Sequence, residues 1–270
     1  MESNVARRLA AETFVSTLES CRDRIGVTER EFSEMWLARM RETGQLTDGW
    51  YDPPPRGVAV LSGLSRISFD SLRPDVNWPG QATIDWDNGC LYAYCSPVSK
   101  ETFALGDFAI TLYFGSDERM RAHFSRTYQA VRDVLNAALS ERSSRALFQQ
   151  SIAIFARYNL RNCAAGVIAS TPPNLGHTLP SAGGIRAGAS QLLPPQTMSE
   201  VRRARRFVSS EDDWDCSNFG QYTVEPQLVN ISDETLPQVS YHYIIDPSRR
   251  IILNEPDAII RSLEHSWLKS

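Results

Sequence analysis

The segment GDFAITLYFG, residues 106–115, sets the pattern from which the rest of the fold is predicted. Apolar and β-branched residues run from Phe108 to Phe114 and a glycine closes the run, which is typical of a strand. Ser116 can then cap a long helix, because apolar residues recur on one helical face at Met120, Phe124, Tyr128, Val131, Leu135 and Leu139. A strand followed directly by an amphipathic helix predicts a sheet covered by helices.

Two helices are predicted before this segment. GVTEREFSEMWLARMRETG, residues 26–44, begins with Thr28 and Glu31 at the spacing of a capping box and ends at Gly44. Before Gly26, apolar residues keep to one helical stripe at Ala6, Leu9, Ala10, Phe14, Leu18 and Cys21. Each helix therefore has one face that must be buried against another element.

Short β-rich runs indicate the other strands, at 58–61, 67–69, 91–95, 222–229 and 239–245, with a turn expected at Asp246-Pro247. A further helix face is marked by Leu147, Phe148, Ile152 and Phe155. Loops are predicted for WYDPPPR, residues 50–56, and for the Pro, Gly and Ser-rich stretch 171–195. The sequence thus predicts an α+β fold in a single domain over residues 1–270.

Composition excludes several classes of function. The net charge is −4, which gives no overall positive field for nucleic acid. No apolar run approaches the roughly 18 residues of a membrane helix, and the polar N-terminus resembles no secretion signal, so a cytoplasmic protein is expected. The basic run between residues 202 and 206 precedes acidic residues and predicts a solvated or self-paired loop. The five scattered cysteines predict reduced, mostly buried thiols.

Four motifs occur in an order that resembles the metallopeptidase family of methionine aminopeptidase, Xaa-Pro aminopeptidase and creatinase. They are GVTEREFSEMWLARMRETG at 26–44, GDFAITLYFG at 106–115, NLGHTLP at 174–180 and YTVEPQL at 222–228. The resemblance implies a pita-bread fold, in which helices cover a curved, mostly antiparallel sheet, and it implies a homodimer. The family's arginine after the aspartate motif is replaced by Ile110.

Members of this family hold two divalent ions with two aspartates, one histidine and two glutamates. The resemblance places one aspartate at Asp107, the histidine at His177 and one glutamate at Glu225. The other aspartate falls on Ser96 and the other glutamate on Ser240 or Tyr241. Two adjacent dications need several carboxylates to offset their repulsion, so no dinuclear centre is expected.

Three functions remain open from the sequence. In the first, Asp107, His177 and Glu225 hold at most one Fe, Mn or Zn ion, which activates water or polarises a carbonyl. In the second, no metal binds, and His177 acts as acid and base on a small amide, amidine or amino-acid-like substrate. In the third, the chain is a non-catalytic binding module.

The remaining site candidates surround these residues. His242 lies beside the lost glutamate and is expected to line the pocket as a further catalytic residue. His123 lies near the apolar stripe of the long helix and is expected to be structural. Residues expected to contact the small-molecule substrate are Trp50, Tyr51, Asp52, Ser96, Asn174, Thr178 and Tyr241.

Overall fold

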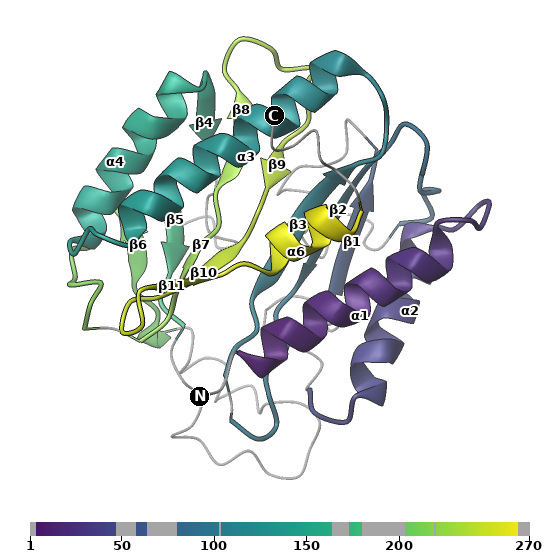
Figure 1. Cartoon of the computed structure of the whole chain (residues 1–270), viewed down its shortest axis with the longest axis horizontal. Coiled ribbons are helices and arrows are strands. Elements are labelled where there is room, and N and C mark those ends of the chain that lie inside the picture. Colours follow the sequence, from purple (N-terminus) through teal and green to yellow (C-terminus); the bar gives the residue numbers. More distant parts are fainter. Residues whose placement is uncertain are drawn as a thin grey trace.

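The computed structural model describes residues 4–46, 58–63, 80–102, 104–163, 173–179, 203–218 and 220–263 (Figure 1). Its elements, in chain order, are α1 (Val5–Cys21), α2 (Glu29–Glu42), β1 (Val58–Ser62), β2 (Cys90–Cys95), β3 (Phe108–Tyr113), α3 (Glu118–Ala138), α4 (Ser144–Arg157), β4 (Leu160–Asn162), β5 (Asn174–His177), β6 (Phe207–Ser209), β7 (Tyr222–Val224), β8 (Gln227–Asn230), β9 (Val239–Ser240), β10 (Tyr243–Asp246), β11 (Ile251–Leu253) and α6 (Glu255–Ser262).

The strands form antiparallel groups that are joined edge to edge. One group has the order β1-β2-β3, and the others have the orders β4-β8-β9, β11-β10-β7 and β5-β6. An antiparallel bridge from Ile110 to Tyr241 links β3 to the later strands, and a bridge from Thr178 to Tyr222 links β5 to β7. Every strand pair among the described residues is antiparallel, as an α+β fold with a mostly antiparallel sheet requires.

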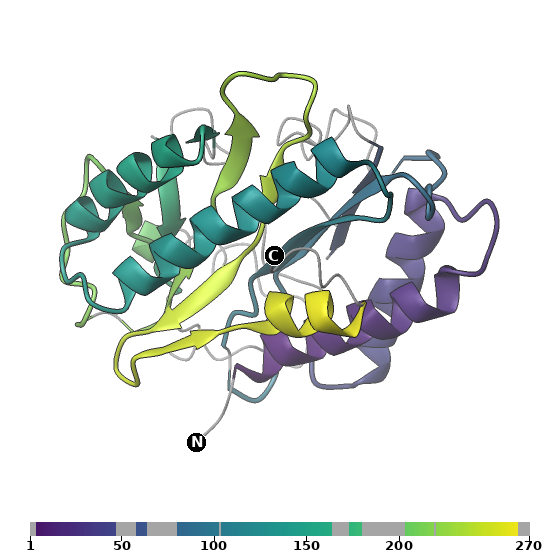
Figure 2. The same ribbon diagram turned by 45° about the horizontal axis from the view of Figure 1, so that its top comes forward.

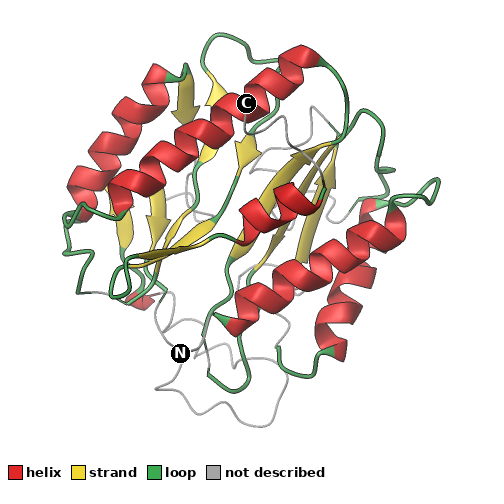
Figure 3. Cartoon of the chain, in the orientation of Figure 1, coloured by secondary structure: helices red, strands yellow, loops and turns green. Residues whose placement is uncertain are grey.

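Helices cover the strands on the side that faces the viewer in Figure 3. Helices α1 and α2 pack on each other and on β3 and β1, respectively, while α3 and α4 pack on each other and α4 also covers β5 and β6. Figure 2 shows α6 lying beside α1, so the last described helix meets the first. None of the helices in the described part of the chain is both long and apolar enough to cross a bilayer.

The two N-terminal helices are confirmed; the second has its predicted boundaries, while the first ends at Cys21, before Gly26. Thr28 accepts a hydrogen bond from the backbone N–H of Glu31, and the Glu31 carboxylate accepts one from the backbone N–H of Thr28, which completes the capping box. Gly44 ends the second helix with φ +67°, a conformation that favours glycine. Phe14 on α1 lies edge-on to Trp36 on α2 with ring centroids 5.2 Å apart, so the two apolar faces form one core.

Replacing Thr28 by alanine is expected to lower the free energy of unfolding by about 1 kcal/mol, because the backbone N–H of Glu31 at the start of α2 loses its side-chain acceptor. Thr28→Ser keeps the hydroxyl acceptor and should unfold at nearly the wild-type urea concentration. Equal destabilisation of the two variants would show that the cap contributes nothing.

The middle helices are confirmed with two corrections. Asp117, not Ser116, caps α3, because its carboxylate accepts a hydrogen bond from the backbone N–H of Met120. In α4, Ile152 was assigned to the buried face but is 53% exposed, and Ile154 is buried in its place. Ser143 caps this helix through the N–H of Ala146.

The later strands differ from the prediction at the positions that matter for the site. The predicted strand 222–229 is interrupted at Glu225 and Pro226, because proline has no N–H for a ladder bond. The predicted strand 239–245 is similarly divided at positions 241–242. The predicted loop 171–195 is wrong at 174–177, which form β5, while the turn after Asp246 is confirmed.

Glycine explains why a chain rich in loop-forming residues becomes a strand here. A Cβ atom at Gly176 would lie 2.1 Å from the carbonyl oxygen of Thr223, so only glycine allows β5 to approach β7.

The loop predicted at 50–56 and the strand predicted at 67–69 lie outside the described residues.

The remaining predictions concern cysteines and the basic run. All five cysteines are free; four are buried and Cys163 is partly exposed, as expected for reduced thiols. Within the basic run, Arg206 donates from Nε to the Asp212 carboxylate at 2.9 Å, so of the two expected arrangements, solvated or self-paired, this residue has the second.

Candidate functional site

Four strand ends bring the site residues together. Asp107 directly precedes β3, His177 is the last residue of β5, Glu225 directly follows β7, and His242 lies between β9 and β10. Backbone hydrogen bonds fix these ends to their neighbours. The N–H of Glu225 donates to the carbonyl of Leu175 at 2.8 Å, and the N–H of His242 donates to that of Ala109 at 3.0 Å.

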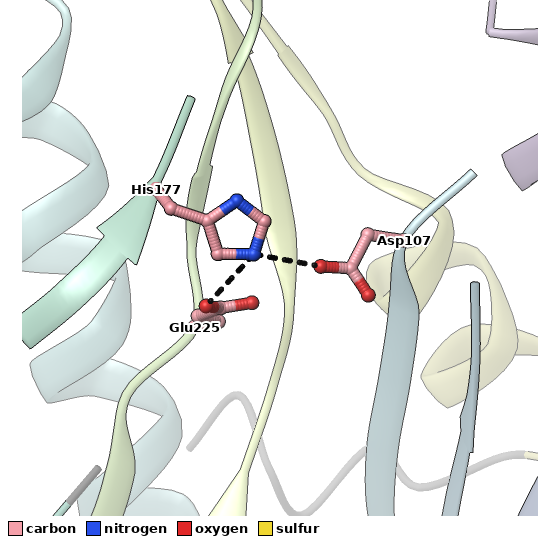
Figure 4. A group of neighbouring side chains, drawn as sticks. All are labelled: Asp107, His177 and Glu225. Carbon is pink, nitrogen blue, oxygen red and sulfur yellow. Dashed lines mark ion pairs between the residues drawn. The ribbon is translucent and has the colours of Figure 1, made fainter. Parts of the chain in front are cut away.

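The imidazole of His177 is oriented by its own backbone neighbour. Its Nδ1 lies 2.9 Å from the carbonyl oxygen of Thr178, and because a carbonyl only accepts, the proton is on Nδ1. Nε2 then carries the lone pair and lies 3.6 Å from Oδ2 of Asp107 and 3.5 Å from Oε1 of Glu225 (Figure 4). The ring therefore presents a ligand nitrogen to two carboxylates.

His242 approaches the same two carboxylates through their other oxygens. Its Nδ1 lies 3.9 Å from Oδ1 of Asp107 and 3.6 Å from Oε2 of Glu225. Among the described residues, neither ring nitrogen of His242 nor Oδ1 of Asp107 has a hydrogen-bond partner. The two carboxylates and the two imidazoles therefore face one another in a buried cluster, and three of their polar atoms have no hydrogen-bond partner among the described residues.

Burial disfavours charge throughout this cluster. It raises the pKa of Asp107 to about 6, and burial followed by the negative charge of Asp107 raises the pKa of Glu225 well above its usual value. Burial also lowers the pKa of His177 to about 3 and the pKa of His242 well below its usual value. A cation bound between the carboxylates would lower the pKa of both, because its positive charge stabilises their ionised forms.

The donor set fits one divalent ion. One ligand atom each from Asp107, His177 and Glu225 lie within 4.8 Å of one another, and in the described part of the chain this is the one such group of three or more His, Cys, Asp or Glu residues. Ligands of a tetrahedral ion with bonds of about 2.1 Å lie roughly 3.4 Å apart. The 3.5 and 3.6 Å separations in this cluster match that spacing.

The positions where the resemblance places further carboxylates hold other groups. Ser96 is 1% exposed, and its hydroxyl accepts a hydrogen bond from the hydroxyl of Tyr94 at 3.0 Å. Tyr241 is fully buried and its ring lies edge-on to that of Tyr128, with centroids 5.9 Å apart. Ser240 donates its hydroxyl to the carbonyl of Pro226 at 2.9 Å.

The other predicted substrate contacts are placed as follows. Asn174 pairs with Ser209 across β5 and β6, and Thr178 accepts a hydrogen bond at its hydroxyl from the N–H of Arg206 at 3.0 Å. Trp50, Tyr51 and Asp52 lie outside the described residues. Contact with substrate therefore stays a prediction for all of them.

His123 is a core residue, as expected. Its side chain is buried, and Nε2 lies 2.8 Å from the carbonyl oxygen of Pro237, outside the group formed by Asp107, His177 and Glu225. It supplies a matched control for substitutions of the site histidines.

Sequence reasoning missed Arg7. This side chain is fully buried, and its guanidinium donates to the carbonyl oxygens of Asp107 and His242. Its Nε also donates to Oε2 of Glu255 on α6 at 2.6 Å. Its burial, though not its contacts, could have been predicted, because Arg7 lies three residues before Ala10 and seven before Phe14, on the apolar stripe of α1.

Solved structures with a similar fold include two aminopeptidases and a dipeptidase. An X-Pro aminopeptidase from Thermotoga maritima has a TM-score of 0.57 and 14% identity, with 90% of this chain and 56% of that chain covered. A dipeptidase from Pyrococcus horikoshii has a TM-score of 0.58 and 18% identity, covering 92% and 57%. A methionine aminopeptidase from Thermotoga maritima has a TM-score of 0.51 and 11% identity, covering 92% and 94%.

The chain has the pita-bread fold. The predicted fold class and the predicted resemblance to aminopeptidases of this fold are both confirmed, at the level of structure. The chain spans little more than half the length of the X-Pro aminopeptidase and the dipeptidase, and nearly all of the methionine aminopeptidase. No protein-family model matches the sequence, and no curated protein matches it.

Proposed function

We propose that this protein is a divergent hydrolase of the pita-bread type that acts on a small amide, amidine or amino-acid-like substrate with one divalent ion. The observation that carries the proposal is the convergence of Asp107, His177 and Glu225 from three separate strand ends, with ligand atoms within 4.8 Å of one another. Peptidases among the structural neighbours support hydrolysis of a C–N bond.

The protein's own residues would divide the work at such a site. His177 is held by the Thr178 carbonyl so that Nε2 faces the ion position, and the two carboxylates offset the charge of one dication. A bound divalent ion supplies Lewis acidity, which acidifies a water or polarises a carbonyl. Glu225 is the more exposed carboxylate, with 15% of its side chain accessible, and is placed to exchange a proton with substrate.

A single ion fits this cluster better than two. Ser96 and Tyr241 supply no carboxylate, so two buried acids would face four positive charges. Such an excess is unfavourable because hydration is lost and the ions repel each other. We therefore propose a mononuclear Fe(II), Mn(II) or Zn(II) site.

Protein purified without chelator is expected to contain about one equivalent of divalent transition metal, measured by inductively coupled plasma mass spectrometry. His177→Gln should reduce this to below roughly a tenth of an equivalent, because the one nitrogen of the three-residue set is lost. His123→Gln, which alters a buried histidine outside the cluster, should leave the metal content unchanged.

The same proteins separate the alternatives. Wild-type protein that stays below a tenth of an equivalent after metal supplementation contradicts the mononuclear site. Turnover of a small amide by that metal-free protein, lost in His177→Gln, would establish His177 as an acid and base without metal. Absence of turnover together with partner binding through a distant surface would establish a binding module.

We also propose that the protein is a homodimer, on the strength of the family resemblance. Light scattering at micromolar concentration is expected to give twice the chain mass of 30.3 kDa. A single-chain mass would remove the dimer from the proposal.

A further inference from the structure

The cluster contains a second imidazole that the three-residue ligand set does not use. His242 is 4% exposed, and neither of its ring nitrogens has a hydrogen-bond partner among the described residues. Burying an imidazole without partners is unfavourable, because each polar atom loses its bond to water without replacement. A bound ion would give the Nδ1 atom of His242, which faces two carboxylates, the partner that it lacks among the described residues.

The separations around His242 resemble those around His177. Nδ1 of His242 lies 3.6 and 3.9 Å from Glu225 and Asp107, while Nε2 of His177 lies 3.5 and 3.6 Å from the same two carboxylates. Each value is close to the roughly 3.4 Å between neighbouring ligands of a tetrahedral ion. Both carboxylates therefore lie at similar distances from two imidazole nitrogens.

Charge also favours this arrangement. Two carboxylates balance one dication, and two neutral imidazoles complete its coordination without adding charge. The resemblance places an anionic oxygen ligand next to this position, at Ser240 or Tyr241, where neither residue carries a carboxylate. The neutral nitrogen of His242, one or two residues further along, would replace it for a single ion.

The backbone holds His242 in place for this role. The backbone N–H of His242 donates to the carbonyl of Ala109 at 3.0 Å, and the Arg7 guanidinium donates to the carbonyl oxygen of His242. The ring of Tyr94 lies edge-on to the imidazole with centroids 5.9 Å apart. The residue is therefore fixed against β3, the strand that also positions Asp107.

We propose that His242 is the fourth protein ligand of the ion, so that the site is a two-histidine, two-carboxylate centre for one divalent transition metal. This rests on the proposed function, because it requires the ion held by Asp107, His177 and Glu225. The second imidazole shifts preference toward Zn(II), Co(II) and Fe(II) and away from Mg(II) and Ca(II), which favour oxygen ligands.

The test is a Co(II) titration of metal-free protein, followed by visible absorption and by competition with a chelator of known affinity. His242→Gln is expected to bind Co(II) at least roughly tenfold more weakly than wild type and with an altered visible spectrum, because one nitrogen ligand is lost. His123→Gln serves as the matched control and should give the wild-type affinity and spectrum.

The outcomes separate this inference from the proposed function. Equal Co(II) affinity and equal spectra for wild type and His242→Gln would overturn the role of His242 and leave the three-residue site intact. Wild-type protein that binds no Co(II) would overturn both. If His242→Gln does not fold, X-ray absorption of Zn(II)-loaded wild type decides: two imidazoles on the ion support the inference, and one overturns it.

Discussion

Replacing Arg7 by methionine is expected to lower the free energy of unfolding by about 3–5 kcal/mol, the range for breaking a buried charged network. The fully buried guanidinium serves three partners, the carbonyl oxygens of Asp107 and His242 and the Glu255 carboxylate. Methionine fills similar space but donates to none of them, so two carbonyl groups behind the site lose their donor. Urea unfolding followed by circular dichroism measures the loss.

The Arg7 contacts also predict an effect on the site. Asp107 and His242 come from different strand ends, and the same guanidinium holds both backbones. We expect Arg7→Met to weaken Co(II) binding even where the variant is folded, because the two residues are no longer held at a fixed separation.

Arg132→Met is the matched control for Arg7→Met. Arg132 on α3 donates at 2.9 Å to Asp257, which lies on α6 as Glu255 does, but the Arg132 side chain is 32% exposed. Removing a partly exposed ion pair should cost about 1 kcal/mol or less and leave metal binding unchanged. Equal losses for the two variants would contradict a special role for Arg7.

Trp36→Ala should have a comparable effect, about 3–5 kcal/mol, because it leaves a large cavity in a closed core. The indole is fully buried, lies 5.2 Å from the ring of Phe14 and 6.1 Å from that of Phe108, and donates to the carbonyl of Ala10 at 3.2 Å. Phe108 follows Asp107 directly, so this core supports the strand end at the site.

Trp36→Phe distinguishes packing from a general intolerance at this position. Phenylalanine retains most of the ring contact and loses one hydrogen bond, so we expect it to be clearly less destabilising than alanine. Thermal and urea unfolding of both variants measure the difference. A cost below about 1 kcal/mol for Trp36→Ala would show that α2 does not share a core with β3.

Local signals in the sequence were sufficient for most helices. The capping box of Thr28 and Glu31 and the apolar stripe of α1 each depend on neighbouring residues, so their prediction needs no tertiary information. Asn174 to His177 could not be predicted in this way, because loop-forming residues become a strand only where Gly176 meets Thr223.

The site was predictable only in part for the same reason. Asp107, His177 and Glu225 could be located from short motifs, and the structure places them together. The partners of Arg7 lie 100, 235 and 248 residues away in the chain, so neither spacing nor periodicity reveals its three contacts. The position of His242 beside the same two carboxylates likewise depends on strand ends that are far apart in the chain.

The most direct test of the single-ion site is a crystal structure of the Zn(II)-loaded protein, with anomalous scattering measured at the zinc edge. We predict one strong anomalous peak within about 2.2 Å of ligand atoms from Asp107, His177 and Glu225. Two peaks at this cluster, or a fully loaded protein with none, would contradict the account.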